Sequence, residues 1–600
     1  MSPVTRGPER PHLSFRTPSF RTLPYPEDKK DHMNNAPRTP HRPSGRAVAA
    51  GIAVAAMLAL SACNANSRPA GEADAEPTAV QQGGTLRILT PSDAINWDPA
   101  TSQNLAITTL GLVERRLTSW KTNPDGSTEV VPDLATDTGT PSDDGASWTF
   151  TLKDGLAFED GTPVTSADVK YSVERSFAPE LSGGLSYHKN LLKGADGYNG
   201  PYQGDELDSI ETPDDKTLVF HLDSAYGDWP WIVSMPAFGA VPEAKDDIRT
   251  YTTQPVATGP YRVAETVEGT SVTLERNPEW DPSTDEARTA GPDSVVFELS
   301  QDETVVAQRL IADSGDDASA FGGSFVPPAQ LAQVQQGPAQ DRLVTSGPGA
   351  LAYLAINTEA EGLDDVDVRR AVSLAVDKNA YRVAAGGEIA GDFATTLVTP
   401  GIPGREEYSN GVNDAAPEGD VERAESLLEE AGWSGRQLRL VVQDDAPTLA
   451  RAQAVQQGLE RAGLKVKIVP QADDVWTQTV TQGDGSGYDL TLSSWQPDFP
   501  SANGNIQPLF HSSQVGGGGY NLARYTSPEA DDLIDRATQA TDPDAAAALW
   551  VEADQLVLGD APVVPLIYTK NSFLHGSKVE NFRIPDFPAY PNYLQVSLAP

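Results

Sequence analysis

A single cysteine, Cys63, follows a short apolar run near the start of the chain and separates the residues before it from the folded part. The run, Ala47–Leu60, contains no charged side chain and is preceded by several arginines. A basic stretch, an apolar core of about a dozen residues and small residues at its end are typical of a secretory signal peptide. The run is too short to span a membrane, which needs about 20 apolar residues. We therefore expect residues 1–62 to be a signal peptide, with Met33 as a possible true start, and we expect the chain to be exported.

The residues around the cysteine also resemble a bacterial lipobox, Leu60-Ser61-Ala62-Cys63. In such signals the cysteine becomes the first residue of the mature protein and its sulfur carries a diacylglycerol. Residues 64–82 lack large apolar side chains and cannot offset the entropy of ordering them. We expect Cys63 to be the lipid attachment site and residues 63–82 to tether the protein to the outer face of the bacterial cell membrane. The alternative is a buried thiol near a terminus.

The remaining residues, Gly83–Pro600, are too many for one hydrophobic core and suit two or three lobes. No cysteine follows Cys63, so stability must come from core packing rather than disulfides. The chain has 85 acidic and 44 basic side chains and a formal net charge of −41. Such a chain repels phosphate backbones, so we expect no nucleic-acid partner. The charge does not by itself indicate a cationic ligand, because acidic surfaces are usually just solvated.

Apolar periodicity predicts strands early in the chain and alternating strands and helices later. Thr85–Leu89 and Ala146–Leu152 alternate as half-buried strands do, and residues 261–275 contain a hairpin pattern. From Asp420 onward, helices alternate with the strands predicted at Leu438–Val442, Leu464–Val469 and Tyr488–Ser494. This alternation predicts a parallel sheet with crossover helices. Further helices are expected to start at Ser527-Pro528 and Asp542-Pro543, and late strands are expected at Val563–Tyr568 and Tyr593–Ser597.

The loop after Tyr488–Ser494 is the candidate ligand site, because ligands of open parallel sheets gather beyond the carboxyl ends of the strands. It offers the stacking ring of Trp495, the carboxylate of Asp498, the ring of Phe499 and the amide of Asn503. A partly desolvated carboxylate holds an ammonium group by a charge-assisted hydrogen bond. The alternative is an aromatic loop that packs on its own lobe and leaves Asp498 exposed.

The loop after Thr85–Leu89 is a second candidate, since Asp93 and Trp97 lie there. The alternative is a plain turn at Asp98-Pro99.

No catalytic or metal-binding pattern is visible in the sequence. It contains no Gly-x-Ser-x-Gly elbow, no His-Glu-x-x-His pair and no phosphate-binding Gly-x-x-x-x-Gly-Lys-Ser/Thr loop. No two histidines after Cys63 stand at metal-ligand spacing. Only His511 follows the candidate loop closely enough to contact a ligand. We therefore expect no enzyme activity, no cofactor and no metal.

Many ordered motifs resemble the extracellular solute-binding proteins, family 5, the peptide- and nickel-binding receptors of ABC importers. They lie in Pro132–Ala135, Ser142–Gly145, Trp148–Val169, Thr258–Tyr261, Arg276–Pro278 and Asp367–Val372. The resemblance implies an α/β, periplasmic-binding-protein-like two-lobe fold of class II, with an extra subdomain in the first lobe. The implied bounds are 83–350 plus 556–600 for the first lobe, about 120–254 for its subdomain and 351–555 for the second lobe.

The resemblance also implies roles for the two candidate loops. In oligopeptide-binding members, an aspartate in a Trp-x-x-Asp-Tyr-like loop holds the peptide's α-amino group. Trp495-Gln496-Pro497-Asp498-Phe499 matches, with Phe499 in place of the usual tyrosine. Asp93 and Ile95 are the possible counterparts of first-loop residues that reach the peptide. No arginine that would grip a carboxyl terminus can be placed, so the ligand class stays open.

The resulting hypothesis is a monomeric, lipid-anchored receptor that captures oligopeptides by hinge closure and delivers them to the permease of an ABC importer. A receptor for a nickel chelate or another small solute is the alternative within binding proteins. A secreted hydrolase is a remote alternative from another class.

Overall fold

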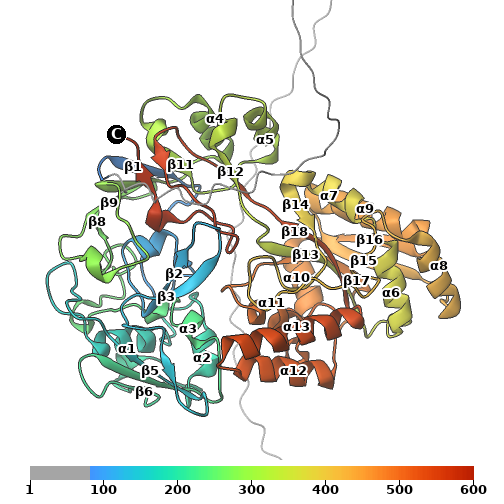
Figure 1. Cartoon of the computed structure of the whole chain (residues 1–600), viewed down its shortest axis with the longest axis horizontal. Helices are drawn as coiled ribbons and strands as arrows, with labels where there is room; N and C mark the ends of the chain where they lie inside the picture. The colour runs from blue at the N-terminus through green and yellow to red at the C-terminus, as the bar shows by residue number, and fades with distance from the viewer. Residues whose placement is uncertain (1–81) are drawn as a thin grey trace, which may run out of the picture. The chain divides into compact units, whose positions relative to one another are not determined.

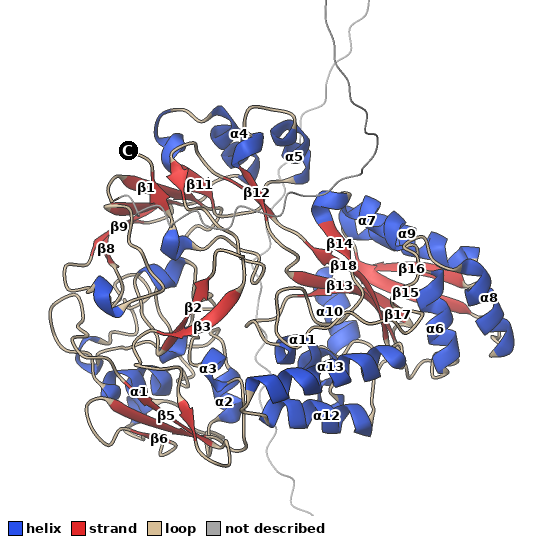
Figure 2. Cartoon of the chain, in the orientation of Figure 1, coloured by secondary structure: helices blue, strands red, loops and turns tan. Residues whose placement is uncertain are grey.

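The computed structural model describes residues 82–600, which fold around three main sheets (Figure 1). The predicted signal peptide, the lipid attachment site at Cys63 and nearly all of the tether lie outside the described residues. Helices and strands are interleaved throughout (Figure 2), as expected of an α/β protein. Within residues 82–600, no helix combines the length and the apolar character that crossing a bilayer requires.

The first lobe contains a five-stranded sheet of order β11-β1-β10-β9-β8. β1 runs parallel to β10 and β11, whereas β10, β9 and β8 are antiparallel neighbours. The helices α4 (Glu303–Ala312) and α5 (Pro328–Gln335) pack beside this sheet. The strands are β1 (Thr85–Leu89), β8 (Tyr261–Val267), β9 (Ser271–Arg276), β10 (Ser294–Glu298) and β11 (Ala320–Gly322). The predicted first strand and hairpin are confirmed.

A four-stranded antiparallel sheet of order β4-β5-β7-β6 and a separate hairpin, β2–β3, lie in the chain between β1 and β8. The edge-to-face rings of Phe150 and Phe220, 5.8 Å apart, join β5 to β7. Thr165 and Asp168 form the capping box that starts α1, as their spacing predicts. The strands are β2 (Thr118–Thr122), β3 (Thr128–Pro132), β4 (Thr140–Pro141), β5 (Ser147–Thr151), β6 (Ile210–Glu211) and β7 (Thr217–His221). The helices are α1 (Ser166–Arg175), α2 (Tyr187–Leu191) and α3 (Trp229–Ile232).

The second lobe contains a six-stranded sheet of order β14-β18-β13-β17-β15-β16. β15 pairs in parallel with both β16 and β17, which confirms the parallel arrangement predicted for the strands between residues 438 and 494. The strands β13, β18 and β14, to which that prediction did not extend, add antiparallel pairs to the same sheet. The strands are β13 (Ala350–Ile356), β14 (Gly391–Phe393), β15 (Gln437–Gln443), β16 (Lys465–Gln471), β17 (Leu490–Trp495) and β18 (Val563–Thr569). β13 and β18 are almost wholly buried apolar runs, and such runs do not by themselves specify the direction of a strand.

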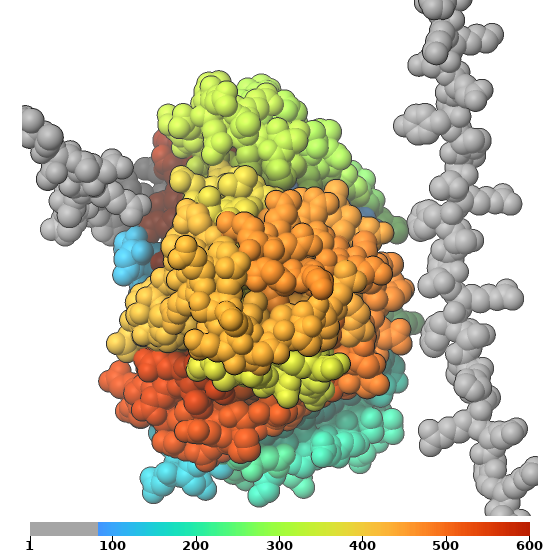
Figure 3. Space-filling view, turned by 90° about the vertical axis from the view of Figure 1, so that its right-hand side faces the viewer, coloured from blue at the N-terminus to red at the C-terminus, as the bar shows by residue number. Residues whose placement is uncertain are grey.

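Helices pack beside this sheet (Figure 1), and Figure 3 shows the same side of the molecule with residues of the second lobe, in yellow and orange, toward the viewer. Asp420, Ser527 and Asp542 cap the helices α8, α12 and α13, as predicted. The helices before β17 are α6 (Val366–Ala375), α7 (Lys378–Ala385), α8 (Val421–Glu430), α9 (Ala446–Arg461) and α10 (Asp473–Thr477). Those after it are α11 (Ala502–Phe510), α12 (Pro528–Gln539) and α13 (Pro543–Gly559).

The chain passes between the two lobes in two adjacent segments. The backbone N–H of Ser346 donates to the carbonyl of Asn571 (2.8 Å), and the backbone N–H of Asn571 donates to the Ser346 hydroxyl (2.9 Å). Because β18 pairs with β13, we place the end of the second lobe after Thr569 rather than near residue 555. Beyond it, β19 (Ser572–Leu574) pairs with β12 (Leu343–Thr345), and β20 (Val579–Glu580) pairs with β21 (Ser597–Leu598). The prediction of a strand at Tyr593–Ser597 is wrong, because residues 593–595 form a 3-10 turn.

Buried charges hold the first lobe together. The guanidinium of Arg175 pairs with Asp98 (2.6 Å) and Asp246 (2.8 Å), and all three side chains are at most 1% exposed. The backbone that follows β1 and the segment before residue 250 are therefore fixed to α1. Such a cluster is costly to break, because removal of one partner leaves uncompensated buried charge.

Candidate functional site

A cavity of about 600 Å³ lies between the two lobes. One wall comes mainly from residues 184–191 and 224–226 of the first lobe, and the other comes from residues 495–539, which run from the end of β17 to the end of α12. The volume lies within the roughly 300–1,000 Å³ that is typical of small-ligand pockets. Four of the predicted ligand-binding residues line it, namely Trp495, Asp498, Phe499 and Asn503.

Asp498 is the half-buried carboxylate of this cavity. The Tyr187 hydroxyl, from the first lobe, donates to Asp498 Oδ2 at 2.5 Å. Burial raises the pKa of Asp498, although this hydrogen bond partly opposes the shift. Burial, together with the nearby Asp498 charge, also raises the pKa of Tyr187, so the phenol stays a donor. Within residues 82–600, no lysine, arginine or histidine forms an ion pair with Asp498, and a ligand cation can take that place.

Aromatic side chains shape the cavity walls. The Tyr187 ring meets the Phe499 ring edge to face, with centroids 5.7 Å apart. Trp495 is the last residue of β17 rather than part of the following loop, and its indole N–H donates to the carbonyl of Gly504 (2.7 Å). Its ring lies 5.0 Å from the Tyr520 ring, and both line the cavity. These rings offer flat faces to a ligand.

A hydrogen-bond network around Asp228 joins the two lobes beside the cavity. Asp228 Oδ2 accepts hydrogen bonds from the Ser501 hydroxyl (2.9 Å) and the Asn503 amide (3.0 Å). The Asn503 amide also donates to the Tyr226 hydroxyl (3.1 Å), so this side chain holds the lobes together in addition to lining the cavity. Burial raises the pKa of Asp228 to about 6, with the two hydrogen bonds opposing the shift.

The sequence did not predict Tyr187, Tyr226 or Asp228 as site residues. They lie in the inserted segment, roughly 270 to 310 positions before their partners, and only the assembled fold brings them to Asp498 and Asn503. A tyrosine at the start of the short helix α2 and another shortly before α3 carry no local signal for such a role.

The first-loop candidates do not line this cavity. Asp93 is exposed, and Ile95 is half-buried against the core. Trp97 is 1% exposed and meets Phe297 edge to face at 6.0 Å. His511 also lies outside the lining, with its Nε2 3.4 Å from the Asp535 carboxylate. The structure therefore does not bring the two predicted loops together at one cavity.

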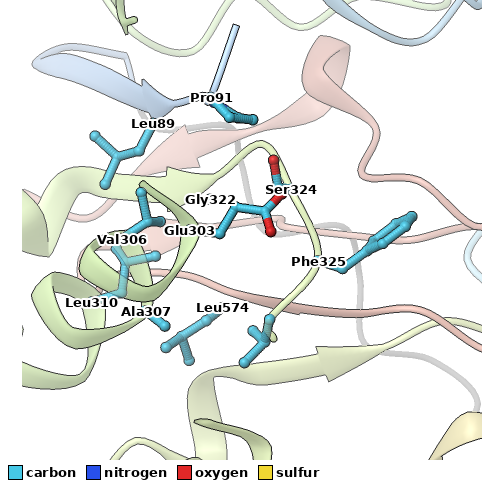
Figure 4. A pocket seen from close by; sticks show the side chains of 11 residues that line it. Leu89, Pro91, Glu303, Val306, Ala307, Leu310, Gly322, Ser324, Phe325 and Leu574 are labelled. Atoms are coloured by element: carbon cyan, nitrogen blue, oxygen red, sulfur yellow. The ribbon is translucent and has the colours of Figure 1, made fainter. Parts of the chain in front are cut away.

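A second hollow lies beside the carboxyl ends of β1 and β11 (Figure 4). Leu89, Val306 and Leu310 form its aliphatic side, and the Phe325 ring stands apart from them. Its volume is about 10 Å³. That is room for about one water molecule, so this hollow is too small for a solute. No group of three metal-ligating side chains is found in the part of the chain that the structure describes.

Comparison with known proteins identifies the family. Residues 129–517, more than half of the chain, match the family model described as "Bacterial extracellular solute-binding proteins, family 5 Middle". The chain belongs to this family. The predicted membership and the two-lobe α/β fold are thereby confirmed, and the family consists of binding proteins rather than enzymes.

Similar proteins bind different solutes, as their names state. The probable D,D-dipeptide-binding periplasmic protein DdpA of Escherichia coli is 27% identical, with 78% of this chain and 85% of the relative covered. Heme-binding protein A of Haemophilus influenzae is also 27% identical, with 86% and 92% covered. The solved structure of clavulanic acid biosynthesis oligopeptide binding protein 2 is 31% identical, has a TM-score of 0.79 and covers 87% of this chain and 96% of its own.

Proposed function

We propose that this protein is the lipid-anchored receptor of an ABC importer, and that it captures oligopeptide-like solutes by their free amino terminus. The observation that carries the proposal is Asp498, a half-buried carboxylate that faces a cavity walled by both lobes. It has one neutral donor and, among residues 82–600, no cationic partner. An α-ammonium group placed there completes a charge-assisted hydrogen bond.

Closure of the lobes would couple binding to delivery. Tyr187 and Tyr226 belong to one wall, and Trp495 and Asp498 to the other, so a ligand contacts all four only when the walls meet. A ligand that touches both walls favours the closed form by the free energy of the contacts absent from the open form. The paired segments at Ser346 and Asn571 are where the chain would bend. The permease would then recognise the closed form.

The names of similar proteins support a peptide as the ligand but do not identify the ligand. Two of the similar proteins are named for dipeptides and oligopeptides, and another is named for heme. A cavity of about 600 Å³ with many neutral hydrogen-bonding groups suits a short peptide whose side chains face water-filled space. This is the basis for choosing peptides first among the possible solutes.

Anchoring through Cys63 would place the receptor beside its permease at the outer face of the membrane. The lipobox-like sequence Leu60-Ser61-Ala62-Cys63 supports this part of the proposal. Replacing Cys63 by serine should abolish labelling of the protein by radioactive palmitate in cells and move the protein from the membrane fraction to the medium. Retention of the label in the Cys63→Ser variant would refute the anchor site.

The ligand class is tested by titration calorimetry of the purified protein with a library of short peptides. Each peptide that binds is then compared with its N-acetylated form. We expect acetylation to remove most of the affinity, because it abolishes the positive charge that Asp498 would hold. Equal affinity for the two forms would contradict recognition of the amino terminus.

A further inference from the structure

We propose that the solute bound in this cavity carries a second positive charge, held near Asp535, and that its carboxylate is left outside. The inference rests on the proposed function and narrows the ligand to basic peptides, those with a lysine or arginine side chain in addition to the free α-amino group.

The evidence is the charge of the cavity lining. Among the described residues that line the cavity, two side chains carry a carboxyl group: the half-buried Asp498 and Asp535, whose side chain is 62% exposed. Among the lining residues that the structure describes, none is lysine, arginine or histidine. The other polar groups are neutral amides and hydroxyls.

The two acids come from different elements. Asp498 follows β17, whereas Asp535 lies in the second half of α12. The nearest imidazole to Asp535 is that of His511, whose Nε2 lies 3.4 Å from Asp535 and 3.9 Å from Asp531. Two carboxyl groups face this one imidazole, so His511 can pair with at most one of them at a time. Asp535 therefore keeps charge available for a ligand cation.

A ligand carboxylate inside this cavity would find no cation to pair with. Removing a charge from water without a compensating partner is costly, and two nearby carboxylates add repulsion. A cation avoids both costs. The ring pair of Trp495 and Tyr520 adds π faces that attract cations. The lining therefore favours a ligand that places two positive groups in the cavity and keeps its carboxyl end in solvent.

The test compares matched tripeptides by titration calorimetry, with lysine, the uncharged isostere norleucine, or glutamate at the second or third position. At one of these positions we expect lysine to bind at least ten times more tightly than norleucine, and glutamate to bind most weakly. Amidation of the C-terminus should leave the affinity unchanged or raise it. N-acetylation should still weaken binding.

Variants assign the two charges to the two acids. Asp535→Asn should remove the difference between lysine and norleucine but keep the effect of acetylation, and Asp498→Asn should do the reverse. Asp532→Asn is the matched control, because this carboxylate lies on the same helix, is 70% exposed and does not line the cavity. Thermal unfolding of each variant checks that the fold is retained.

The outcomes separate this inference from the proposed function. If lysine and norleucine bind equally, or if amidation weakens binding tenfold, the inference is overturned, while sensitivity to acetylation still supports the receptor for peptide amino termini. If no peptide binds but 1,5-diaminopentane does, the two-cation inference holds and the peptide function falls. If neither peptides nor the diamine bind, both fall.

Discussion

Replacing Asp498 by asparagine tests the recognition mechanism with little change of shape. The amide keeps an oxygen that can accept the hydrogen bond from the Tyr187 hydroxyl, now 2.5 Å from Asp498 Oδ2. It also keeps the volume of the side chain, so the edge-to-face contact between Tyr187 and Phe499 should persist. What the variant loses is the negative charge that faces the cavity.

The expected loss follows from the type of bond removed. A hydrogen bond to a charged group contributes about 1.5–3 kcal/mol. At about 1.4 kcal/mol for each factor of ten, this corresponds to a dissociation constant roughly 10 to 150 times higher for a peptide with a free amino terminus. The upper half of the range is favoured, because Asp498 is half-buried and screened from water on one side. An N-acetylated peptide should bind the variant and the original protein equally.

Calorimetry with both peptides and both proteins forms a double-mutant cycle that isolates the pairing of carboxylate and ammonium. Asp143→Asn is the matched control, because Asp143 is exposed and lies outside the cavity lining. The reasoning is refuted if Asp498→Asn leaves the affinity for the peptide with a free amino terminus unchanged. It is also refuted if the substitution lowers the affinity for the acetylated peptide by the same factor.

Three further predictions concern closure and stability. A Cβ on Gly227 would lie 1.9 Å from the backbone oxygen of Ala540, so Gly227→Ala should hold the lobes apart and raise the radius of gyration measured by X-ray scattering. Gly559→Ala is the control and should not change the radius, because nothing lies within 4 Å of the added Cβ. Equal radii for Gly227→Ala and the original protein would contradict the close contact at Gly227. Burial raises the pKa of Asp228 from 3.8 to about 6, so between these pH values the closed form binds a proton that the open form does not, and closure should weaken as the pH rises from 4 to 6. Asp228→Asn should flatten this pH dependence of the radius of gyration. If the variant and the original protein show the same pH dependence, Asp228 is not its cause. Arg175→Met leaves two buried carboxylates without their cation and should lower the free energy of unfolding by about 3–5 kcal/mol in urea; a loss below 1 kcal/mol would disprove the importance of the cluster.

Local signals predicted local structure well. The caps at Asp420, Ser527 and Asp542 and the capping box at Thr165 each satisfy backbone N–H groups within a few residues, so the sequence contains the whole interaction. The direction and partners of β18 were not predictable in this way. Its apolar run specifies burial on both faces, and its pairing with β13 joins residues more than 200 positions apart.

The candidate site was predicted from one wall only. The end of a buried strand and an aromatic, acidic loop indicated Trp495, Asp498, Phe499 and Asn503, and the structure places all four at one cavity. The opposite wall depends on how the inserted segment packs across the lobes, which no periodicity or cap encodes. Asp535 was missed because a carboxylate on the polar side of a helix has the same pattern whether it faces a cavity or open water.

A crystal structure of the protein with its natural solute, identified beforehand by native mass spectrometry, tests the central claim most directly. We predict a ligand ammonium nitrogen about 2.7–2.9 Å from the Asp498 carboxylate, inside the cavity and in contact with both lobes. A ligand bound elsewhere, or one whose amino group points away while Asp498 faces solvent, would contradict it.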